Sequence, residues 1–365
     1  MPAKKKRWQP PHDAATRAAA LRPSRDSSYV PAAWMEPCLL ECCEPLARHD
    51  ANDWLGKDQP GETNGDRTGQ TFAQFCRPGP RRSFPSKSQC VIYLTALGPA
   101  DEAPAVAVLA DCLRAYFLMD VVVGKPVAGK AFAALDIDDE GGAGYGPQLE
   151  TTPCCDLLYS RKPRDAFISI GFTMFDICNT ESGFNFLFGE AQLDKGCGIF
   201  SFARYRDRAA DVEPRLFLRR CCMVLCHEAT HLFGIKHCVF AACLMNGSNH
   251  LQEADRRPFD LCPVDMAKLR DSFRGAGIGG WDQLPPRATA SSAAATSRRE
   301  PEPELQSSQP RPGAGAKAAG GVVTDPLVRR DQAMLDFLET HGLEMDAEVY
   351  KRKLDFIRRT IAPCT

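Results

Sequence analysis

The feature that most constrains this chain is the stretch Cys226–Cys238, which reads CHEATHLFGIKHC. His227 and His231 are four residues apart, so on a helix their imidazoles lie on one face and can reach the same ion. Glu228 is displaced by about 100° around the helix axis, so it can hold a water molecule instead of binding the metal. The spacing therefore predicts a helix that carries two metal ligands and a general base.

The end of this stretch supplies a third candidate ligand. Gly234 can end the helix because glycine enters the left-handed conformation at little cost, and the chain then turns back to His237. Three neutral imidazoles leave the fourth position of tetrahedral zinc open, which is typical of a catalytic site. The alternative is a core helix whose histidines pack or cap, and it leaves Gly234 and His237 unexplained. We therefore expect a catalytic Zn²⁺ held by His227, His231 and His237, with Glu228 as the general base.

Composition and charge limit the classes of molecule that the chain is expected to bind. Lys+Arg (45) and Asp+Glu (46) nearly cancel, so no chain-wide field favours nucleic acid. No apolar run approaches the roughly 20 residues that a membrane helix requires. We expect a peptide or protein substrate, and neither nucleic acid nor a membrane as partner.

The cysteines and the first residues bear on the compartment. The opening MPAKKKRWQPP has no apolar stretch behind its basic cluster, so we do not expect a secretory signal. The 17 cysteines then fit thiols kept reduced in the cytoplasm, with some of them binding metal. Lys4–Arg7 is a candidate nuclear address, and a solvated basic tail is the alternative. The expected location is cytoplasmic, with the nucleus as the second candidate.

Changes in composition divide the chain into four parts. Residues 1–87 are rich in Pro, Arg, Asp and Gly and are expected to be a partly disordered N-terminal extension. Residues 88–280 carry the periodic patterns of a catalytic domain. Residues 281–324 have almost no large apolar side chains and are expected to be a disordered linker. Residues 325–365 recover helical spacing and predict a helical pair broken at His341-Gly342.

The catalytic part reads as an α/β (α+β) fold, a mixed sheet packed against an active-site helix. Apolar runs predict a strand–helix–strand unit at the start of this part, followed by further strands and then the helix. Acidic residues and glycines predict a mobile loop at 136–149. The expected strands are 89–97, 119–124, 165–171, 184–189 and 198–205, and the expected helices are 101–117 and 214–234.

The pattern HExxHxxGxxH, followed by Cys238, Cys243 and Met245, resembles that of the archaemetzincins, which belong to the metzincin zinc metallopeptidases. The resemblance extends over about residues 88–275, including matches at 171–176, 184–191 and 198–205. It implies a metzincin-like fold and peptide hydrolysis, of aminopeptidase type on small peptides. It also implies that Met245 is the Met-turn residue beneath the three histidines. The stretch ending at 201–205 resembles the edge strand beside the cleft, which can pair with an extended substrate.

The same resemblance implies a second, structural zinc held by four cysteines. Cys238, Cys243 and Cys262 fall on three of the four positions, but the fourth is Asp265, in the sequence Cys-Pro-Val-Asp. Asp265 can bind zinc through oxygen and complete a Cys₃Asp site. A hydrated or empty site is the alternative, and Cys222 or Cys226 could take the missing place.

Several alternatives remain open at this point. The rival to a peptidase is a zinc-stabilised interaction protein without turnover. Separately, the N- or C-terminal extension is a candidate for binding a protein partner. Asp265 is the observation that favours this rival, and Glu228 argues against it, because a structural site has no use for a carboxylate beside its ligands. Arg204 and Tyr205 are candidates for stabilising an oxyanion. His250 is expected to be a loop residue.

Overall fold

The computed structural model describes residues 13–23, 31–50, 52–56, 68–77, 84–135, 137–138, 145–206, 212–278, 281 and 325–361. The basic cluster Lys4–Arg7 and nearly all of the predicted linker lie outside these residues. The helices are α1 (Ala14–Ala19), α2 (Met35–Glu41), α4 (Phe72–Phe75), α5 (Val106–Phe117), α6 (Lys130–Ala133), α7 (Thr151–Ser160), α8 (Pro214–His231), α9 (Leu251–Arg256), α10 (Pro263–Ser272), α11 (Pro326–Thr340) and α12 (Glu344–Ile361), with 3₁₀ turns at Trp54–Gly56 and Ala203–Tyr205. The strands are β1 (Val91–Ala96), β2 (Asp120–Val123), β3 (Ile137–Asp138), β4 (Gln148–Glu150), β5 (Ala166–Thr173), β6 (Asp176–Asn179), β7 (Phe184–Leu187), β8 (Gly189–Gln192) and β9 (Cys197–Ser201).

A five-stranded sheet in the order β2-β1-β5-β9-β8 supports the candidate site. The first four strands are parallel to their neighbours, and β8 runs antiparallel to β9. Every residue of β5 and β9 is buried, as expected for interior strands covered on both faces. The predicted strand–helix–strand unit is confirmed as β1, α5 and β2.

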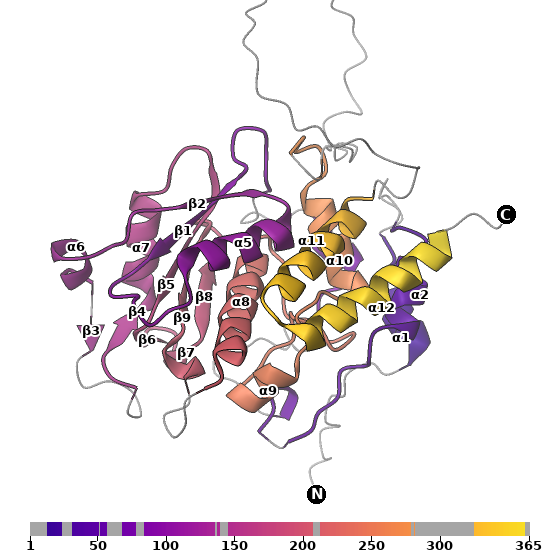
Figure 1. Ribbon diagram of the computed structural model, residues 1–365, viewed down its shortest axis with the longest axis horizontal. Helices are drawn as coiled ribbons and strands as arrows, with labels where there is room; N and C mark the ends of the chain where they lie inside the picture. The colour runs from indigo at the N-terminus through magenta and orange to yellow at the C-terminus, as the bar shows by residue number, and fades with distance from the viewer. Residues whose placement is uncertain are drawn as a thin grey trace, which may run out of the picture.

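Helices cover both faces of this sheet (Figure 1). On one face α7 packs against β5 and β9, and on the other α5 and α8 pack against each other and against the sheet. The side chains divide accordingly. Ile168, Ile170 and Phe200 face the large core beneath α8, and Leu158 and Ile199 belong to a smaller core beneath α7. The expected mixed sheet packed on an active-site helix is therefore observed.

A second, smaller sheet has the order β3-β4-β6-β7. Two of its strands, β3 and β4, lie in the 136–149 stretch where we expected only a loop, and short pairings of this kind carry little periodicity to detect. The strand predicted at 184–189 is in fact two strands in different sheets, because β7 pairs with β6 and β8 pairs with β9. The chain crosses from one sheet to the other at Phe188 and Gly189.

The C-terminal helices pack on the body of the fold (Figure 1). The predicted pair is confirmed: α11 contacts α5 and α10, and Gly342 turns the chain with φ of 65° before α12. Between these helices and the body lies a buried ion cluster in which Arg330 and Lys353 contact Asp260 and Asp331. Such a cluster is stable only while every charge keeps its partner.

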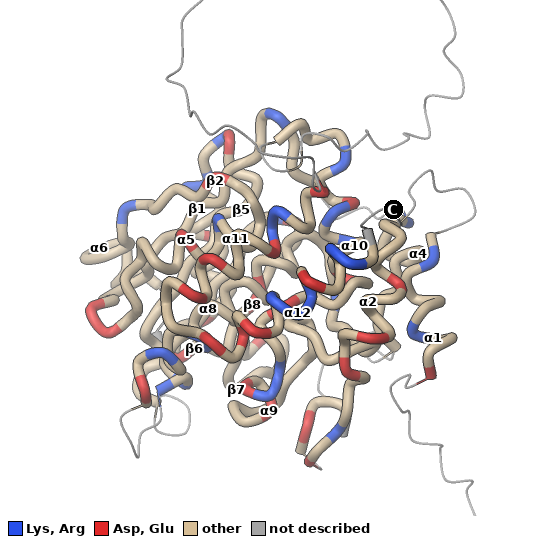
Figure 2. Tube along the Cα trace, turned by 45° about the vertical axis from the view of Figure 1, so that its right-hand side comes forward, with Lys and Arg blue, Asp and Glu red and all other residues tan. Residues whose placement is uncertain are grey.

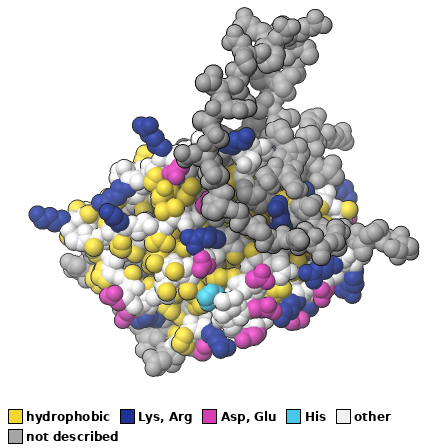
Figure 3. Space-filling model, turned by 45° about the horizontal axis from the view of Figure 1, so that its top comes forward, with side chains coloured by type: hydrophobic (Ala, Val, Ile, Leu, Met, Phe, Trp, Pro, Cys, Tyr) yellow, Lys and Arg dark blue, Asp and Glu magenta, His cyan; other side chains and the backbone are white. Residues whose placement is uncertain are grey.

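The surface of the described residues is mixed in charge. Acidic and basic residues are interspersed over the trace (Figure 2), and on one face apolar side chains lie among charged ones (Figure 3). The edge strand β2 exposes Val122 and Val123, each with 42% of its surface accessible. Among the described residues, the helices are all too short or too polar to cross a membrane.

Candidate active site

Helix α8 positions the first two candidate ligands. Its start is defined by the side chain of Glu213, which accepts a hydrogen bond from the Leu216 backbone N–H, and by Pro214 in the first turn. The helix ends at His231, three residues earlier than predicted, and residues 232–234 form a turn. Gly234 has φ of 80°, the left-handed conformation that we expected there.

The two histidines on α8 are fixed through their Nδ1 atoms. Nδ1 of His227 lies 2.8 Å from the carbonyl oxygen of Leu244, and Nδ1 of His231 lies 2.6 Å from that of Ile235. A carbonyl only accepts, so both Nδ1 atoms carry the proton and each neutral ring has its lone pair on Nε2. The two Nε2 atoms are 3.1 Å apart. Two lone pairs facing each other at this distance repel, and a shared cation removes the repulsion.

His237 completes the group from the other side of the turn. Its ring centroid lies 4.9 Å from that of His231 and 5.4 Å from that of His227. One nitrogen from each of the three rings lies within 4.8 Å of the others. Ligands at about 2.0–2.1 Å from tetrahedral zinc lie about 3.3 Å from one another, so the donor set fits this ion. The structure thus brings together the three histidines proposed from the sequence.

Glu228 points into the same space without joining the histidine group. Burial raises the pKa of its carboxyl to about 8, Arg257 opposes this shift, and Glu190 adds to it. Gly189 makes room for the side chain: a Cβ there would lie 2.6 Å from Cγ of Glu228 and 2.9 Å from Cδ. A side chain at position 189 would therefore displace the carboxylate.

A cavity of about 480 Å³ opens beside these residues. One wall is formed by residues 183–189, which contain β7 and the crossing to β8. His227, Glu228 and His237 form its floor, and Trp54, Asn249 and Arg257 lie among the residues of the remaining wall. The cavity is large enough for a few residues of an extended peptide.

The assignment of 201–205 as the edge strand beside the cleft is wrong. Strand β9, which ends at Ser201, lies between β5 and β8, and residues 203–205 form a 3₁₀ turn. The alternating pattern indicated a strand but could not show that another strand covers its outer side. The edge beside the cavity belongs to β8 and to residues 183–189.

Met245 lies on a tight turn that touches the histidine group. The turn runs from Cys243 to Asn246, whose backbone N–H donates to the Cys243 carbonyl at 3.1 Å. Met245 is fully buried, and its carbonyl accepts from the Cys238 N–H at 2.8 Å. Leu244 in the same turn is the residue whose carbonyl accepts from His227. The turn therefore connects the position of Met245 to the orientation of a candidate ligand.

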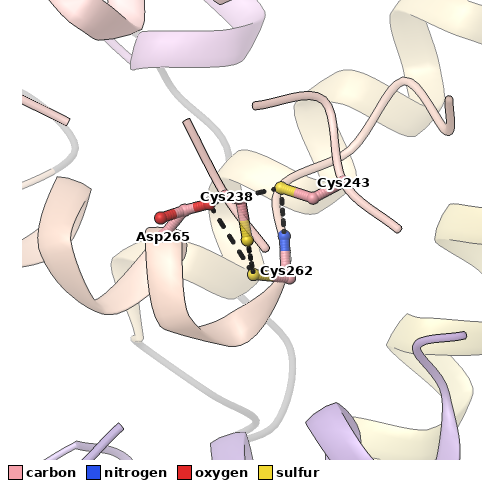
Figure 4. Close-up of side chains that lie close together, drawn as sticks. All are labelled: Cys238, Cys243, Cys262 and Asp265. Atoms are coloured by element: carbon pink, nitrogen blue, oxygen red, sulfur yellow. Dashed lines mark hydrogen bonds between the residues drawn. The ribbon is translucent and has the colours of Figure 1, made fainter. Parts of the chain in front are cut away.

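The residues proposed for a second zinc also come together, in a fully buried cluster (Figure 4). Sγ of Cys238 lies 3.6 Å from Sγ of Cys262, and Sγ of Cys243 lies 3.3 Å from Oδ2 of Asp265. Burial raises the pKa of Asp265 to about 7, while Lys268, 2.7 Å from its other oxygen, lowers it. Hydrogen bonds from Cys238 and Cys243 overcome the effect of burial and lower the pKa of the Cys262 thiol.

The remaining sequence candidates have other partners. Cys226 lies 3.8 Å from Cys112 in the core beneath α8, and Cys222 also contacts Cys112, so neither replaces the missing fourth cysteine. No disulfide joins the cysteines of the described residues. Arg204 is held by both oxygens of Asp176. These contacts remove three of the alternatives that the spacing had left open.

Of the two remaining candidates, Tyr205 lies at the cavity and His250 does not line it. Tyr205 lines the cavity and stacks on Phe188 with centroids 5.2 Å apart. His250 caps α9, accepting from the Glu253 N–H, and its Nε2 lies 3.0 Å from Asp53. His250 is thus a loop residue, as expected.

Trp54 and Arg257 were missed by the sequence reasoning. Arg257 donates to the carbonyl of Asn246 at 2.6 Å, and its guanidinium reaches the cavity. No spacing pattern singles it out within the sequence ADRRPFD. Trp54 offered a weak signal, because a large aromatic side chain in a polar segment usually has something to pack against.

Comparison with known proteins identifies the family of the chain. Residues 162–271 match the model of peptidase family M54. The chain is 32% identical over 259 residues to archaemetzincin-2 of Homo sapiens and to that of Pongo abelii, covering 62% of this chain and 69% of each relative. The crystal structure of archaemetzincin from Methanopyrus kandleri is 26% identical and superposes with a TM-score of 0.42, covering 51% of this chain and 96% of that one. The chain belongs to the archaemetzincin family, and it is a zinc-dependent metallopeptidase.

Proposed function

We propose that the catalytic zinc is held by His227, His231 and His237, and that Glu228 is the general base of peptide hydrolysis. The observation that carries this proposal is the pair of Nε2 lone pairs 3.1 Å apart, with His237 beside them and Glu228 in the same cavity. Zinc in such a site supplies Lewis acidity, which lowers the pKa of water and polarises a peptide carbonyl. No protein nucleophile is required, so no covalent intermediate is expected.

The work of the protein groups follows from their positions. Glu228 takes a proton from the attacking water and passes it to the departing amine. Its place in the same cavity as the histidines suits both halves of this transfer, because the attacking water and the departing amine would both lie there. Residues 183–189 present a strand edge to the cavity, which an extended peptide backbone can pair with. Arg257 and Tyr205 line the cavity and are the candidates for contacting the polarised carbonyl.

We further propose aminopeptidase-type cleavage of small peptides, as the family resemblance implies. The restricted cavity supports a small substrate.

The test is hydrolysis of a panel of short peptides with free and with acetylated N-termini. The zinc-loaded protein is expected to cleave the free peptides, to lose activity after chelation, and to regain it when zinc is returned. Activity that survives complete metal removal would contradict the zinc mechanism. Equal rates on free and acetylated peptides would contradict the aminopeptidase assignment alone.

We also propose that Cys238, Cys243, Cys262 and Asp265 bind a second, structural zinc. Three thiolates and a carboxylate around Zn²⁺ carry a net charge of about −2, and the buried ammonium of Lys268 offsets part of it. In the family pattern the fourth position is a cysteine, and the Asp265 carboxylate carries the same charge as a thiolate, so the replacement leaves the charge of the ligand set unchanged. The Cys262→Ser variant is expected to lose one zinc per chain and keep the other. Unchanged stoichiometry by metal analysis would contradict the second site.

A further inference from the structure

The loop that carries His237 is held from outside by the N-terminal part of the chain. We call residues 234–247 the ligand loop, because they contain His237, Cys238, Cys243 and Met245. Arg17 donates to the Phe240 carbonyl at 2.8 Å, and the Ala242 N–H donates to the Glu44 carbonyl at 2.7 Å. The N-terminal segment is therefore part of the scaffold around the site.

One of these contacts reaches the metal centre itself. The indole of Trp54 packs edge-on against the His237 ring, with centroids 5.1 Å apart and planes at 71°. Gly247 leaves the space that the indole fills, because a Cβ there would lie 2.4 Å from the ring. Trp54 is buried, yet it also lines the cavity beside Glu228. It thus touches both the third candidate ligand and the space for substrate.

The turn that carries Trp54 is fixed to α9. The Trp54 backbone N–H donates to both oxygens of Glu253, at 2.8 and 3.0 Å. Asp53 lies 2.6 Å from Arg256 and 3.0 Å from His250. A turn held at these points has little freedom, so the indole is presented in one orientation.

His237 lacks the restraint that its two partners have. His227 and His231 each donate Nδ1–H to a backbone carbonyl. Among the described residues, no hydrogen bond is made by the His237 ring, and Trp54 is the one aromatic side chain outside the histidine group that packs on it. Metal-binding histidines almost always have a second partner that sets the ring orientation. Here the indole is in the position to do this by packing.

We propose that Trp54 is a positioning residue for His237 and, at the same time, a wall of the substrate cavity. The inference rests on the proposed role of His237 as a zinc ligand. Gln70 supports the same loop independently, since it donates to the Gly234 carbonyl and accepts from the Lys236 N–H, both at 3.2 Å. The backbone of the loop is therefore expected to stay in place when the indole is removed. What changes is the orientation of the His237 ring, which is no longer fixed.

The test is the rate at which zinc passes from the protein to a chelating dye. Zinc release from the three-histidine site is identified as the kinetic phase that disappears in a His231→Ala variant. In Trp54→Leu this phase is expected to be about 10–100-fold faster, the usual cost of losing a group that orients a ligand. Trp54→Phe keeps a ring against His237 and is expected to restore slow release. Asp53→Asn, which loosens the turn but keeps the indole, is expected to fall between the two.

Trp34→Leu is the matched control. Trp34 is also a buried tryptophan of the N-terminal segment, but it does not line the cavity. This variant is expected to melt earlier and to release zinc at the wild-type rate. Wild-type release from Trp54→Leu, or equally fast release from Trp34→Leu, would overturn the proposal.

Peptide kinetics test the proposed role of Trp54 as a wall of the substrate cavity, separately from its role in positioning His237. At saturating zinc, Trp54→Leu is expected to raise KM for short peptides, because the cavity loses a wall, and an unchanged KM would remove that role. If the wild-type protein cleaves none of the peptides, the proposed function fails. The zinc-release result still decides the positioning role in that case.

Discussion

Replacing Glu228 with glutamine is expected to lower kcat/KM for peptide hydrolysis by about 10²–10⁴-fold, the usual contribution of a general base. The amide has nearly the shape of the carboxylate and fits beside Gly189, but it cannot accept a proton. Zinc content is expected to stay unchanged, because Glu228 lies outside the histidine group. The measurement is the rate on one peptide at equal zinc content of wild type and variant.

Glu150→Gln provides the control for this comparison. Glu150 precedes α7 and binds the hydroxyl of Thr180, away from the residues that line the cavity. Its replacement is expected to leave the rate within a few-fold of wild type. Equal activity of wild type and Glu228→Gln would reject the mechanism. Absence of turnover in both would favour a zinc-stabilised protein that acts by binding.

Replacing Asp260 with asparagine is expected to destabilise the fold by about 3–5 kcal/mol, the usual effect of leaving buried charge without its partner. Arg330 and Lys353 both contact Asp260, and the variant leaves them with Asp331 alone. The midpoint of urea unfolding is expected to fall accordingly. The stability is lost from the packing of α11 and α12 on the body of the fold, because Arg330 and Lys353 come from these helices.

An exposed carboxylate of the same helix pair shows what a surface charge contributes. Asp355 pairs with Arg358 at 3.4 Å, with 66% of its side chain accessible. Asp355→Asn is expected to change stability by less than about 1 kcal/mol. A loss in Asp260→Asn no larger than in Asp355→Asn would show that the buried cluster rearranges without cost.

The part of the site that could be predicted is the part encoded locally. The spacing of His227 and His231 determines their common face once the helix forms, and Gly234 marks where the chain must turn. His237 follows from the length of that turn. Met245 and the three cysteines came from the family pattern, and their convergence shows that the substitution at Asp265 does not disperse the cluster.

The rest depends on contacts between distant segments. Trp54 lies 183 positions before His237, and no periodicity links the two. Residues 184–189 are divided between two sheets because the two halves pair with different strands. A single apolar run carries no information about its pairing partners. Residues 198–205 alternate like a strand and the family resemblance placed them at the edge, but β8 covers β9 from the outside. The domain boundaries at 88, 281 and 325 stay a prediction.

The ion cluster at Asp260 also has a consequence for biosynthesis. Asp260 is two positions before Cys262, and its backbone carbonyl accepts from the N–H of Leu244 in the ligand loop. Its countercharges Arg330 and Lys353 are translated 70 and 93 residues later, on α11 and α12. Until those residues are translated, the two cations that contact Asp260 in the folded protein are missing, so we expect the ligand loop to reach its final form only after α11 and α12 have docked.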